Sequence, residues 1–297
     1  MTFKEKLESG QFIVCGELGP PQSANGNMVR KKSCHFKGVV DAVNITDNQT
    51  AIVRMSSIAA AKILLDEQVE PIIQMTCRDR NRIAIQSDLL GAAALGLENV
   101  LCLTGDYQRF GNHPEARPVF DMDSIQLIAT CAQMNAGSFL SGDLIKTPPS
   151  FCIGGAANPF AEPFDMRIIR LEKKIKAGAH FIQTQPVFDL ERFIKWMDAV
   201  RERGLHEKTA ILAGVMPVKS VNALLHMKNE VPGMRVDPAY IARMERAADA
   251  PEEGVKMTVE IIREIRNIKG IRGIHLMPLM WESITPVILK EAGISIH

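Results

Sequence analysis

Two acidic residues follow short apolar segments, a placement that suits proton transfer. Residues 99–106 read Asn-Val-Leu-Cys-Leu-Thr-Gly-Asp, so Asp106 comes directly after a mostly apolar run. Glu17 follows the apolar segment Phe12–Cys15. Runs this short are typical of strands buried on both faces, and the carboxyl ends of parallel strands carry the chemistry of many α/β proteins. Glu17 and Asp106 are therefore our candidate catalytic residues.

Each of these carboxyl groups also has a simpler structural interpretation. Asp106 could cap a turn or a helix, as aspartates after strands often do. Glu17 could pair with a lysine across the fold. In favour of a chemical role, Pro20 and Pro21 stiffen the segment after Glu17. An apolar setting favours the protonated form of a carboxyl group, which is the form that a general acid needs.

A predicted helix at Asp165–Ala177 carries basic residues on one face. Arg167, Arg170 and Lys174 are spaced i, i+3 and i+7, and Lys173 lies beside them. Such a face is usually exposed to solvent. The alternative is a clamp for a phosphate group. The spacing alone is compatible with both interpretations.

The elements that must position these residues alternate between strand and helix along the chain. The predicted strands are Phe12–Cys15, Asp41–Ile45, Glu70–Met75, Asn99–Leu103, Phe151–Gly154, Phe181–Thr184, Ala210–Gly214 and Gly273–Leu276. The predicted helices are Gly26–Phe36, Ile52–Leu65, Asp79–Leu95, Ser124–Met134, Asp165–Ala177, Leu190–Arg203, Val218–Lys228, Pro238–Ala248, Glu252–Ile268 and Ile284–Ala292. Ser124 or Asp123 is the expected cap of the fourth of these helices.

This alternation predicts an α/β protein whose strands are parallel. The length of 297 residues accommodates a (β/α)8 TIM barrel, which typically needs about 250 residues, as a single domain over residues 1–297. An open, doubly wound sheet is the alternative, but no Gly-x-Gly-x-x-Gly motif follows the first strand.

A barrel would bring the ends of its strands to one mouth. The polar residues at those ends are Glu17, Thr46, Gln74, Asp106, Asn158 and Gln185. Two carboxyl groups among neutral hydrogen-bonding side chains suit proton transfer to a polar heterocycle.

Composition excludes several classes of partner. The chain has 35 Lys and Arg against 34 Asp and Glu, a net charge of +1, so we expect neither nucleic acid nor a membrane surface as a partner. The six cysteines form no Cys-x-x-Cys pair and the seven histidines have no metal-ligand spacing, so no metal site is expected. The first residues lack the apolar core of a signal peptide. We therefore expect a cytoplasmic protein.

Several motifs, in order, resemble those of the methylenetetrahydrofolate reductase family over nearly the whole chain. They are Glu17 with Pro20-Pro21, Asn44-Ile45-Thr46, Met75-Thr76-Cys77, Leu103-Thr104-Gly105-Asp106, Lys174 with Ala177-Gly178-Ala179, and Gln185-Pro186-Val187-Phe188-Asp189. Each is weak alone, whereas their order and spacing together are specific. The resemblance implies a flavin-dependent (β/α)8 barrel of one-carbon metabolism and methionine biosynthesis.

The resemblance also implies a reaction, the reduction of 5,10-methylenetetrahydrofolate to 5-methyltetrahydrofolate. Glu17 would be the general acid that opens the folate ring to a 5-iminium cation, and Asp106 would stabilise that cation. The cofactor would be FAD, with FMN as the alternative. Flavin contacts are implied for Thr46, Gln74, Leu103, Thr104, Gly105, Asp106, Ala156, Asn158, Arg170 and Lys174. Folate contacts are implied for Glu17, Asp106, Gln185, Met227 and Leu279.

At four positions the chain departs from the pattern of well-known relatives. Gln74 replaces a flavin-contacting histidine, Met227 an aromatic residue, Trp281 an arginine and Ala223 a glutamine. In those relatives the last three positions lie on the face of the site that NADH and folate occupy in turn. The resemblance therefore leaves open whether NAD(P)H is the electron donor. The chain is more similar to a branch in anaerobic one-carbon pathways, in which a small iron–sulfur or zinc subunit delivers electrons.

The partners expected are therefore folate, such a subunit and further copies of this chain. A pterin-binding subunit without redox turnover is a further alternative. Because the chain ends at His297, we expect no regulatory C-terminal extension of the eukaryotic kind.

Overall fold

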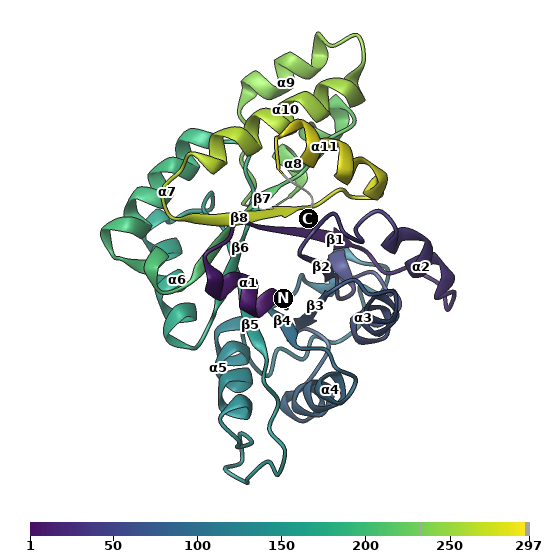
Figure 1. The fold of residues 1–297 in the computed structure, drawn as a ribbon, viewed down its shortest axis with the longest axis vertical. Coiled ribbons are helices and arrows are strands. Elements are labelled where there is room, and N and C mark those ends of the chain that lie inside the picture. The colour runs from purple at the N-terminus through teal and green to yellow at the C-terminus, as the bar shows by residue number, and fades with distance from the viewer. Residues whose placement is uncertain (232, 295–297) are drawn as a thin grey trace.

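Eight parallel strands close a barrel in the computed structural model, which describes residues 1–231 and 233–294 (Figure 1). The strands pair in the order of the chain, and β1 closes the barrel against β8. They are β1 (Ile13–Leu18), β2 (Ala42–Ile45), β3 (Pro71–Thr76), β4 (Asn99–Leu103), β5 (Cys152–Ala157), β6 (Phe181–Pro186), β7 (Ala210–Val215) and β8 (Ile271–Leu276). The predicted (β/α)8 barrel is confirmed.

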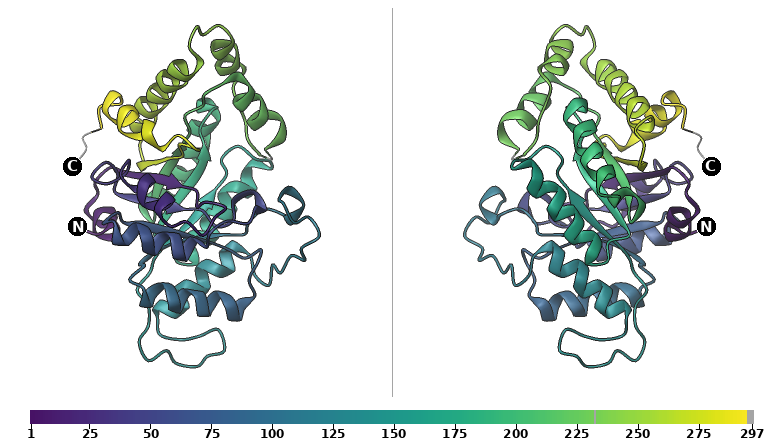
Figure 2. Two further views of the ribbon diagram at one scale, coloured as in Figure 1. Left: turned by 90° about the vertical axis from the view of Figure 1, so that its right-hand side faces the viewer. Right: turned by 90° about the vertical axis from the view of Figure 1, so that its left-hand side faces the viewer.

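Helices cover the outside of this barrel (Figures 1 and 2). They are α1 (Phe3–Ser9), α2 (Asn27–Ser33), α3 (Ser57–Asp66), α4 (Arg82–Ala94), α5 (Ser124–Asn135), α6 (Phe164–Lys176), α7 (Leu190–Glu202), α8 (Val221–Glu230), α9 (Pro238–Glu245), α10 (Ala250–Arg266) and α11 (Thr285–Glu291). Short 3-10 turns lie at η1 (Gln49–Ala51), η2 (Gln108–Phe110), η3 (Leu205–Glu207) and η4 (Glu282–Ile284). Asp123 forms the expected cap of α5, and Gln126 completes a capping box with it.

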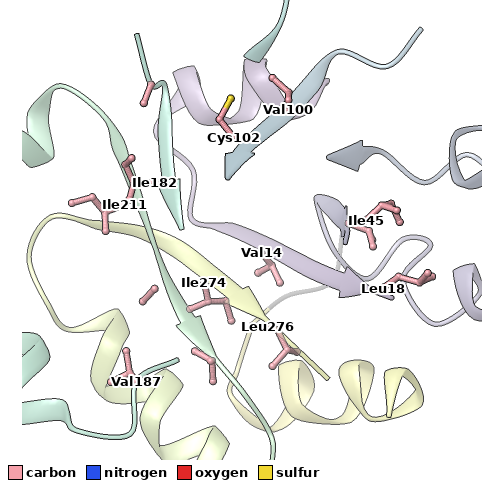
Figure 3. Packing of buried hydrophobic residues seen from close by; sticks show 14 of the residues in the cluster. Val14, Leu18, Ile45, Val100, Cys102, Ile182, Val187, Ile211, Ile274 and Leu276 are labelled. Carbon is pink, nitrogen blue, oxygen red and sulfur yellow. The ribbon is translucent and has the colours of Figure 1, made fainter. Parts of the chain in front are cut away.

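Alternating side chains divide the core into two parts. Residues that point outward from the strands, such as Val14, Ile45 and Ile274, pack against the helices (Figure 3). Residues that point inward, such as Ile13 and Cys15, fill the barrel. Cys15, Cys77, Cys102, Cys131 and Cys152 are all buried free thiols, which pack as small apolar side chains.

Helix α1 closes the amino-terminal end of the barrel. Thr2 and Glu5 form a capping box at its start, and Gly10 ends it with a φ of 84°. Its side chains Phe3 and Leu7 join the inward-facing cluster, and the Phe3 ring meets that of Phe181 edge-on at 5.2 Å. Apolar side chains therefore block this end, and any ligand must enter from the other.

Three strands continue two or more residues further toward their carboxyl ends than predicted. Gly16, Glu17 and Leu18 pair with β2, so Glu17 belongs to β1 and not to the loop after it. Strand β5 includes Ala157 and β6 includes Pro186. The predicted strands are shorter because glycine and proline in these segments usually mark strand ends. Gly154 instead lies inside β5, where a side chain would not fit. A Cβ atom there would lie 2.2 Å from the Phe181 ring.

Helices α3, α4 and α8 begin three or more residues later than predicted, and the Asn81 side chain caps α4. Helix α3 starts at Ser57 because residues 49–51 form the turn η1, in which Thr50 and Ala51 have φ values of 54° and 57°. The following segment is extended, and the Met55 amide donates to the Pro21 carbonyl at 2.9 Å. Helix α8 starts at Val221, where the Ser220 side chain caps it.

Within the described residues, no helix has both the length and the apolar content that crossing a membrane requires.

The closure by α1 predicts a large stability effect at Phe3. Replacing Phe3, which is 1% exposed, by alanine should destabilise the fold by about 3–5 kcal/mol because it opens a cavity in the barrel. Urea unfolding monitored by circular dichroism measures this change. The matched control is Phe110→Ala, since Phe110 is 54% exposed and its loss should cost little. Equal effects of the two substitutions would contradict the proposed closure.

Candidate active site

Glu17 and Asp106 lie at the same end of the barrel. All eight strands are parallel, Glu17 is near the carboxyl end of β1, and Asp106 follows β4. Asp106 is exposed, and its carbonyl accepts a hydrogen bond of 3.3 Å from the buried Arg78. The two acidic residues therefore share one mouth, as the barrel prediction requires.

Glu17 is held by an amide and an imidazole. Gln74 Nε2 donates to Glu17 Oε2 at 3.3 Å, and His275 Nε2 lies 3.4 Å from the same oxygen. The Glu17 side chain is only 11% exposed. In the part of the chain that the structure describes, its partner is thus a histidine, not the lysine considered as an alternative. Neither neighbour carries a permanent positive charge.

A layer of polar side chains lies inside the barrel between the apolar filling and the mouth. Asn44 on β2, Gln183 on β6 and His275 on β8 are buried. Among the described residues, Asn44 Oδ1 and both polar atoms of Gln183 have no hydrogen-bond partner, and His275 Nε2 has only the long contact with Glu17. Because buried polar groups in proteins are normally satisfied, these atoms are suited to bind water or a polar ligand in the mouth.

The sequence analysis did not identify this layer. The alternation of side chains in a strand could have identified it. Asn44 and Gln183 lie two residues before Thr46 and Gln185, which were assigned to the mouth, so they face the same side of their strands. His275 and Glu17 lie on neighbouring strands, because β8 pairs with β1 and His275 is in register with Cys15. This pairing exists only because the barrel is closed.

A cationic cavity of about 200 Å³ opens at the ends of β4, β5 and β6. Seven predicted site residues line it, and they are Leu103, Thr104, Ala156, Asn158, Arg170, Lys174 and Gln185. Arg167 is also in the wall, and its buried Nε atom finds no hydrogen-bond acceptor in the described part of the chain. Three cations from one face of α6 thus point into a single small space, which favours the phosphate-clamp interpretation of this helix.

Lys174 is a buried cation. It is 8% exposed, so the solvent-exposed interpretation is wrong for this residue, whereas the neighbouring Lys173 is exposed. Lys174 Nζ donates to the Ala156 carbonyl, and within the described ranges no carboxylate lies at ion-pair distance from it. Burial first, and then the charge of Arg170, lower the pKa of Lys174 to about 8. An anion in this cavity would raise the pKa of Lys174 again by stabilising its charged form.

A second groove of about 580 Å³ adjoins the cationic cavity, with which it shares Thr104. The rings of Tyr107 and Phe120 meet there at 5.4 Å, and Asp121 and Asp123 add carboxylates. Gly105 begins this loop with a φ of 94°, where a Cβ atom would lie 2.9 Å from Arg78 Cβ. The groove combines aromatic surface with hydrogen-bond acceptors.

Buried ion pairs fix the loops that follow β2 and β3. Asp47 accepts hydrogen bonds from the amide and hydroxyl of Thr76 at 2.9 Å and from Arg80 Nη1 at 2.7 Å. Thr46, a predicted site residue, is buried and donates to Gln49 Oε1 at 2.7 Å. Such contacts hold the rim in one arrangement.

The remaining predicted residues lie apart from the cationic cavity. Leu279 lines another cavity, which also contains Glu17. Met227 is half-buried and packs against the outer core. Trp281 is half-buried, with Lys219 Nζ 4.8 Å from its ring centroid.

Comparison with known proteins agrees with the residue pattern. The family model described as methylenetetrahydrofolate reductase matches residues 2–293. The chain belongs to the methylenetetrahydrofolate reductase family. "Methylenetetrahydrofolate reductase 2" of Schizosaccharomyces pombe is 26% identical over an alignment of 316 positions, which covers 98% of this chain and 47% of that protein.

Other similar proteins include longer family members and a solved barrel. "Probable methylenetetrahydrofolate reductase (NADPH)" of Caenorhabditis elegans is 26% identical over 97% of this chain and 43% of its own length. The chain therefore spans about half the length of these relatives, or less. A solved protein from Clostridium thermocellum, described as uncharacterized and binding two copies of 5-methyl-5,6,7,8-tetrahydrofolic acid, has 15% identity and a TM-score of 0.67. The alignment covers 97% of this chain and 95% of that structure, and it shows a shared fold.

The buried Lys174 of this family member predicts a pH dependence of stability. The unfolded lysine titrates near its ordinary pKa of 10.5 and the folded one near 8. Between these values the unfolded state binds more protons, so the free energy of unfolding rises with pH, by up to roughly 3 kcal/mol. Below pH 8 the penalty for burying the charge is fully present, and above 10.5 it is absent.

Urea unfolding of the ligand-free protein at pH 7 and pH 10 measures this effect. Lys174→Met should raise stability at pH 7, and its advantage over the wild type should shrink by pH 10. Lys173→Met is the control, because Lys173 is exposed. The comparison removes contributions of other groups that titrate in this range. An advantage of Lys174→Met that is the same at both pH values would contradict the burial of a charged lysine.

Proposed function

We propose that the chain catalyses the flavin-dependent reduction of 5,10-methylenetetrahydrofolate to 5-methyltetrahydrofolate. The observation that carries this proposal is Glu17, a largely buried carboxyl group in the mouth whose neighbours are Gln74 and His275. Family membership and the names of the longer relatives support the same reaction. The cationic cavity beside the mouth supplies a site for a phosphate-bearing cofactor.

The residues of the mouth fit a flavin nucleotide. Lys174, Arg170 and Arg167 would hold its phosphate, because they are cations that point into one cavity and Lys174 lacks an anionic partner among the described residues. The unpaired polar atoms of Gln183 fit a heterocycle rich in hydrogen-bonding groups. Thr46, Gln74, Leu103, Thr104, Gly105, Ala156 and Asn158 complete the proposed cofactor contacts. When bound, reduced flavin supplies the hydride that the folate accepts.

The groove at Tyr107 and Phe120 favours FAD over FMN. It continues from the cationic cavity through Thr104, so an adenosine attached to the phosphate would meet this groove. Aromatic rings suit the adenine and the carboxylates of Asp121 and Asp123 suit ribose hydroxyls. FMN has no group for this groove.

Glu17 would act on the folate as a general acid. It donates a proton to N10, the bond between N10 and the bridging carbon breaks, and a 5-iminium cation remains. The negative charge of Asp106 at the same mouth would stabilise this cation. Gln185, exposed at the end of β6, offers an amide to the pterin, and Leu279 and Met227 are the proposed apolar contacts.

Two versions of this function differ in the electron donor. In one version NAD(P)H reduces the flavin, as the names of relatives indicate for those proteins. In the other, a partner subunit with an iron–sulfur or zinc centre delivers electrons to a catalytic subunit. The second version is favoured by two departures from the pattern of well-known relatives, Met227 in place of an aromatic residue and Trp281 in place of an arginine.

Glu17→Gln tests the proposed acid. Turnover of methylenetetrahydrofolate should fall by roughly 10²–10⁴-fold, because the amide cannot donate the proton. Reduction of the bound flavin should be unchanged, since it needs no proton transfer to folate. Anaerobic stopped-flow absorbance separates the two steps, with NADH and an artificial low-potential donor compared as electron sources.

Glu98→Gln is the matched control, because Glu98 is exposed just before β4 at the other end of the barrel. Full folate turnover by Glu17→Gln would remove Glu17 from the reaction. A chain that binds pterins but never reduces them would favour the alternative of a non-redox subunit.

Cofactor uptake tests the cationic cavity. Lys174→Met should weaken FAD binding by about tenfold or more, since a charge-assisted hydrogen bond to phosphate is lost. Lys176→Met, two residues away on α6 and exposed where it pairs with Glu172, should bind FAD as the wild type does. Titration of the apoprotein with FAD and with FMN, followed by flavin fluorescence, gives both affinities. A wild-type chain that binds neither flavin would overturn the proposed cofactor.

A further inference from the structure

Both neighbours of Glu17 approach the same one of its two carboxyl oxygens. Gln74 Nε2 on β3 donates to Glu17 Oε2 at 3.3 Å, and His275 Nε2 on β8 lies 3.4 Å from the same atom. Among the described residues, no group donates a hydrogen bond to Glu17 Oε1. Glu17 also lines a cavity of about 550 Å³ that a ligand can enter. The two oxygens of this carboxyl group therefore have different surroundings.

His275 has one use for this nitrogen within the protein. The residue is 4% exposed, and its Nε2 atom has no partner other than Glu17 in the described part of the chain. Strand β8 pairs with β1, which fixes His275 beside Glu17. A buried polar atom without a partner is costly, so an imidazole with its proton on Nε2 gains by donating to Oε2.

Gln74 reaches Glu17 from the other side of β1. The strands are ordered β8, β1, β2 and β3 around the closed barrel, so His275 lies on one neighbour of β1 and Gln74 lies two strands away in the opposite direction. Gln74 is 8% exposed, and Ser57 Oγ donates to its backbone carbonyl at 2.9 Å. The side-chain amide of Gln74 is an uncharged donor at any pH. Two donors thus approach Oε2 from both sides.

Across residues 1–231 and 233–294, no lysine or arginine lies at ion-pair distance from Glu17. The charged groups that line the same cavity are Lys32, Arg54 and Glu282. Lys32 pairs with Glu282, so these two charges compensate each other. Asp106 follows β4 at the same mouth and adds a like charge. The direct contacts of Glu17 are therefore an amide and an imidazole.

We propose that Gln74 and His275 are positioning residues that direct the acidic proton of Glu17 to Oε1, and thereby toward N10 of the folate. The proposal rests on the proposed function and adds two residues to it. A protonated carboxyl group carries its hydrogen on one oxygen and keeps the other as an acceptor. Two donors on Oε2 make that oxygen the acceptor, so the hydrogen occupies Oε1, to which no group of the described residues donates.

The same two donors assist the proton transfer itself. As the O–H bond of Glu17 breaks, the lone pair of N10 takes the proton and the carboxyl group becomes a carboxylate. The bond between N10 and the bridging carbon then gives its electron pair to N10, and the lone pair of N5 forms the iminium double bond. Hydrogen bonds to Oε2 strengthen as negative charge grows there, so they stabilise the transition state more than the ground state.

Variants that remove one donor test this role on the flavin-loaded full chain. His275→Met and Gln74→Met should each slow the oxidation of reduced flavin by methylenetetrahydrofolate by about tenfold or more, because a hydrogen bond to a developing charge is lost. The KM for the folate should change little, since these bonds strengthen only as the proton leaves. Reduction of the flavin by an artificial low-potential donor should keep its rate in His275→Met. Anaerobic stopped-flow absorbance measures both steps.

Further measurements separate positioning from packing. The solvent deuterium isotope effect on the folate step should rise in both variants, because proton transfer then limits that step more strongly. His275→Gln keeps a donor near the place of Nε2 and should recover most of the rate. Gln74→Lys keeps a donor but adds a fixed cation, which favours the carboxylate form of Glu17, so its rate should recover only as the pH is lowered. In a Glu17→Gln background, His275→Met should cause no further loss of the folate step, because it acts through Glu17.

Gln86→Met is the control, because Gln86 lies on α4 and its amide donates to the Arg82 carbonyl at 2.8 Å. Wild-type rates in His275→Met and Gln74→Met, in a chain that Glu17→Gln inactivates, would leave the proposed function standing and remove the positioning role. Equal losses in His275→Met and His275→Gln would show that the ring only fills space, which also removes that role. A wild type whose reduced flavin methylenetetrahydrofolate cannot oxidise would refute the proposed function and the positioning role together.

Discussion

Closure of eight parallel strands fixes what each inward-facing side chain can do. Because every strand runs the same way and side chains alternate, the position of a residue along its strand sets its depth in the barrel. At the amino end, Phe3 and Phe181 fill the interior, whereas Gln183 and Gln185 lie progressively nearer the mouth on the same strand as Phe181. The interior thus changes from apolar to polar along its axis, and the chemistry is confined to one end.

The same constraint explains why much of the site can be predicted from sequence. Glu17, Gln74 and Gln185 each follow or end an apolar strand, so a barrel assigns them to one mouth before any coordinates are known. Cap residues such as Asp123 act through local hydrogen bonds, and they too can be read from the chain. Features that depend on local hydrogen bonds, or on strand direction alone, can therefore be predicted from the sequence.

Other features depend on contacts between distant segments. Lys174 differs from Lys173 by one position on a helix, yet only the packing of α6 against β5 shows which of them is buried. His275 approaches Glu17 only because β8 closes against β1. Gly154 suggests a strand end until the Phe181 ring shows that the position must lack a side chain. These relations join residues far apart in sequence, so no short pattern records them.

The cavity beside Glu17 contains two carboxyl groups in different circumstances. Glu282 is paired with Lys32, and this ion pair joins η4 to α2. Removing either partner would leave the other charge without its counterion, which assigns Glu282 to structure. Glu17 instead contacts an amide and an imidazole, and no lysine or arginine of the described residues forms an ion pair with it. Of the two, only Glu17 also contacts the polar layer of the barrel, so it is the carboxyl group that reaches the interior of the mouth.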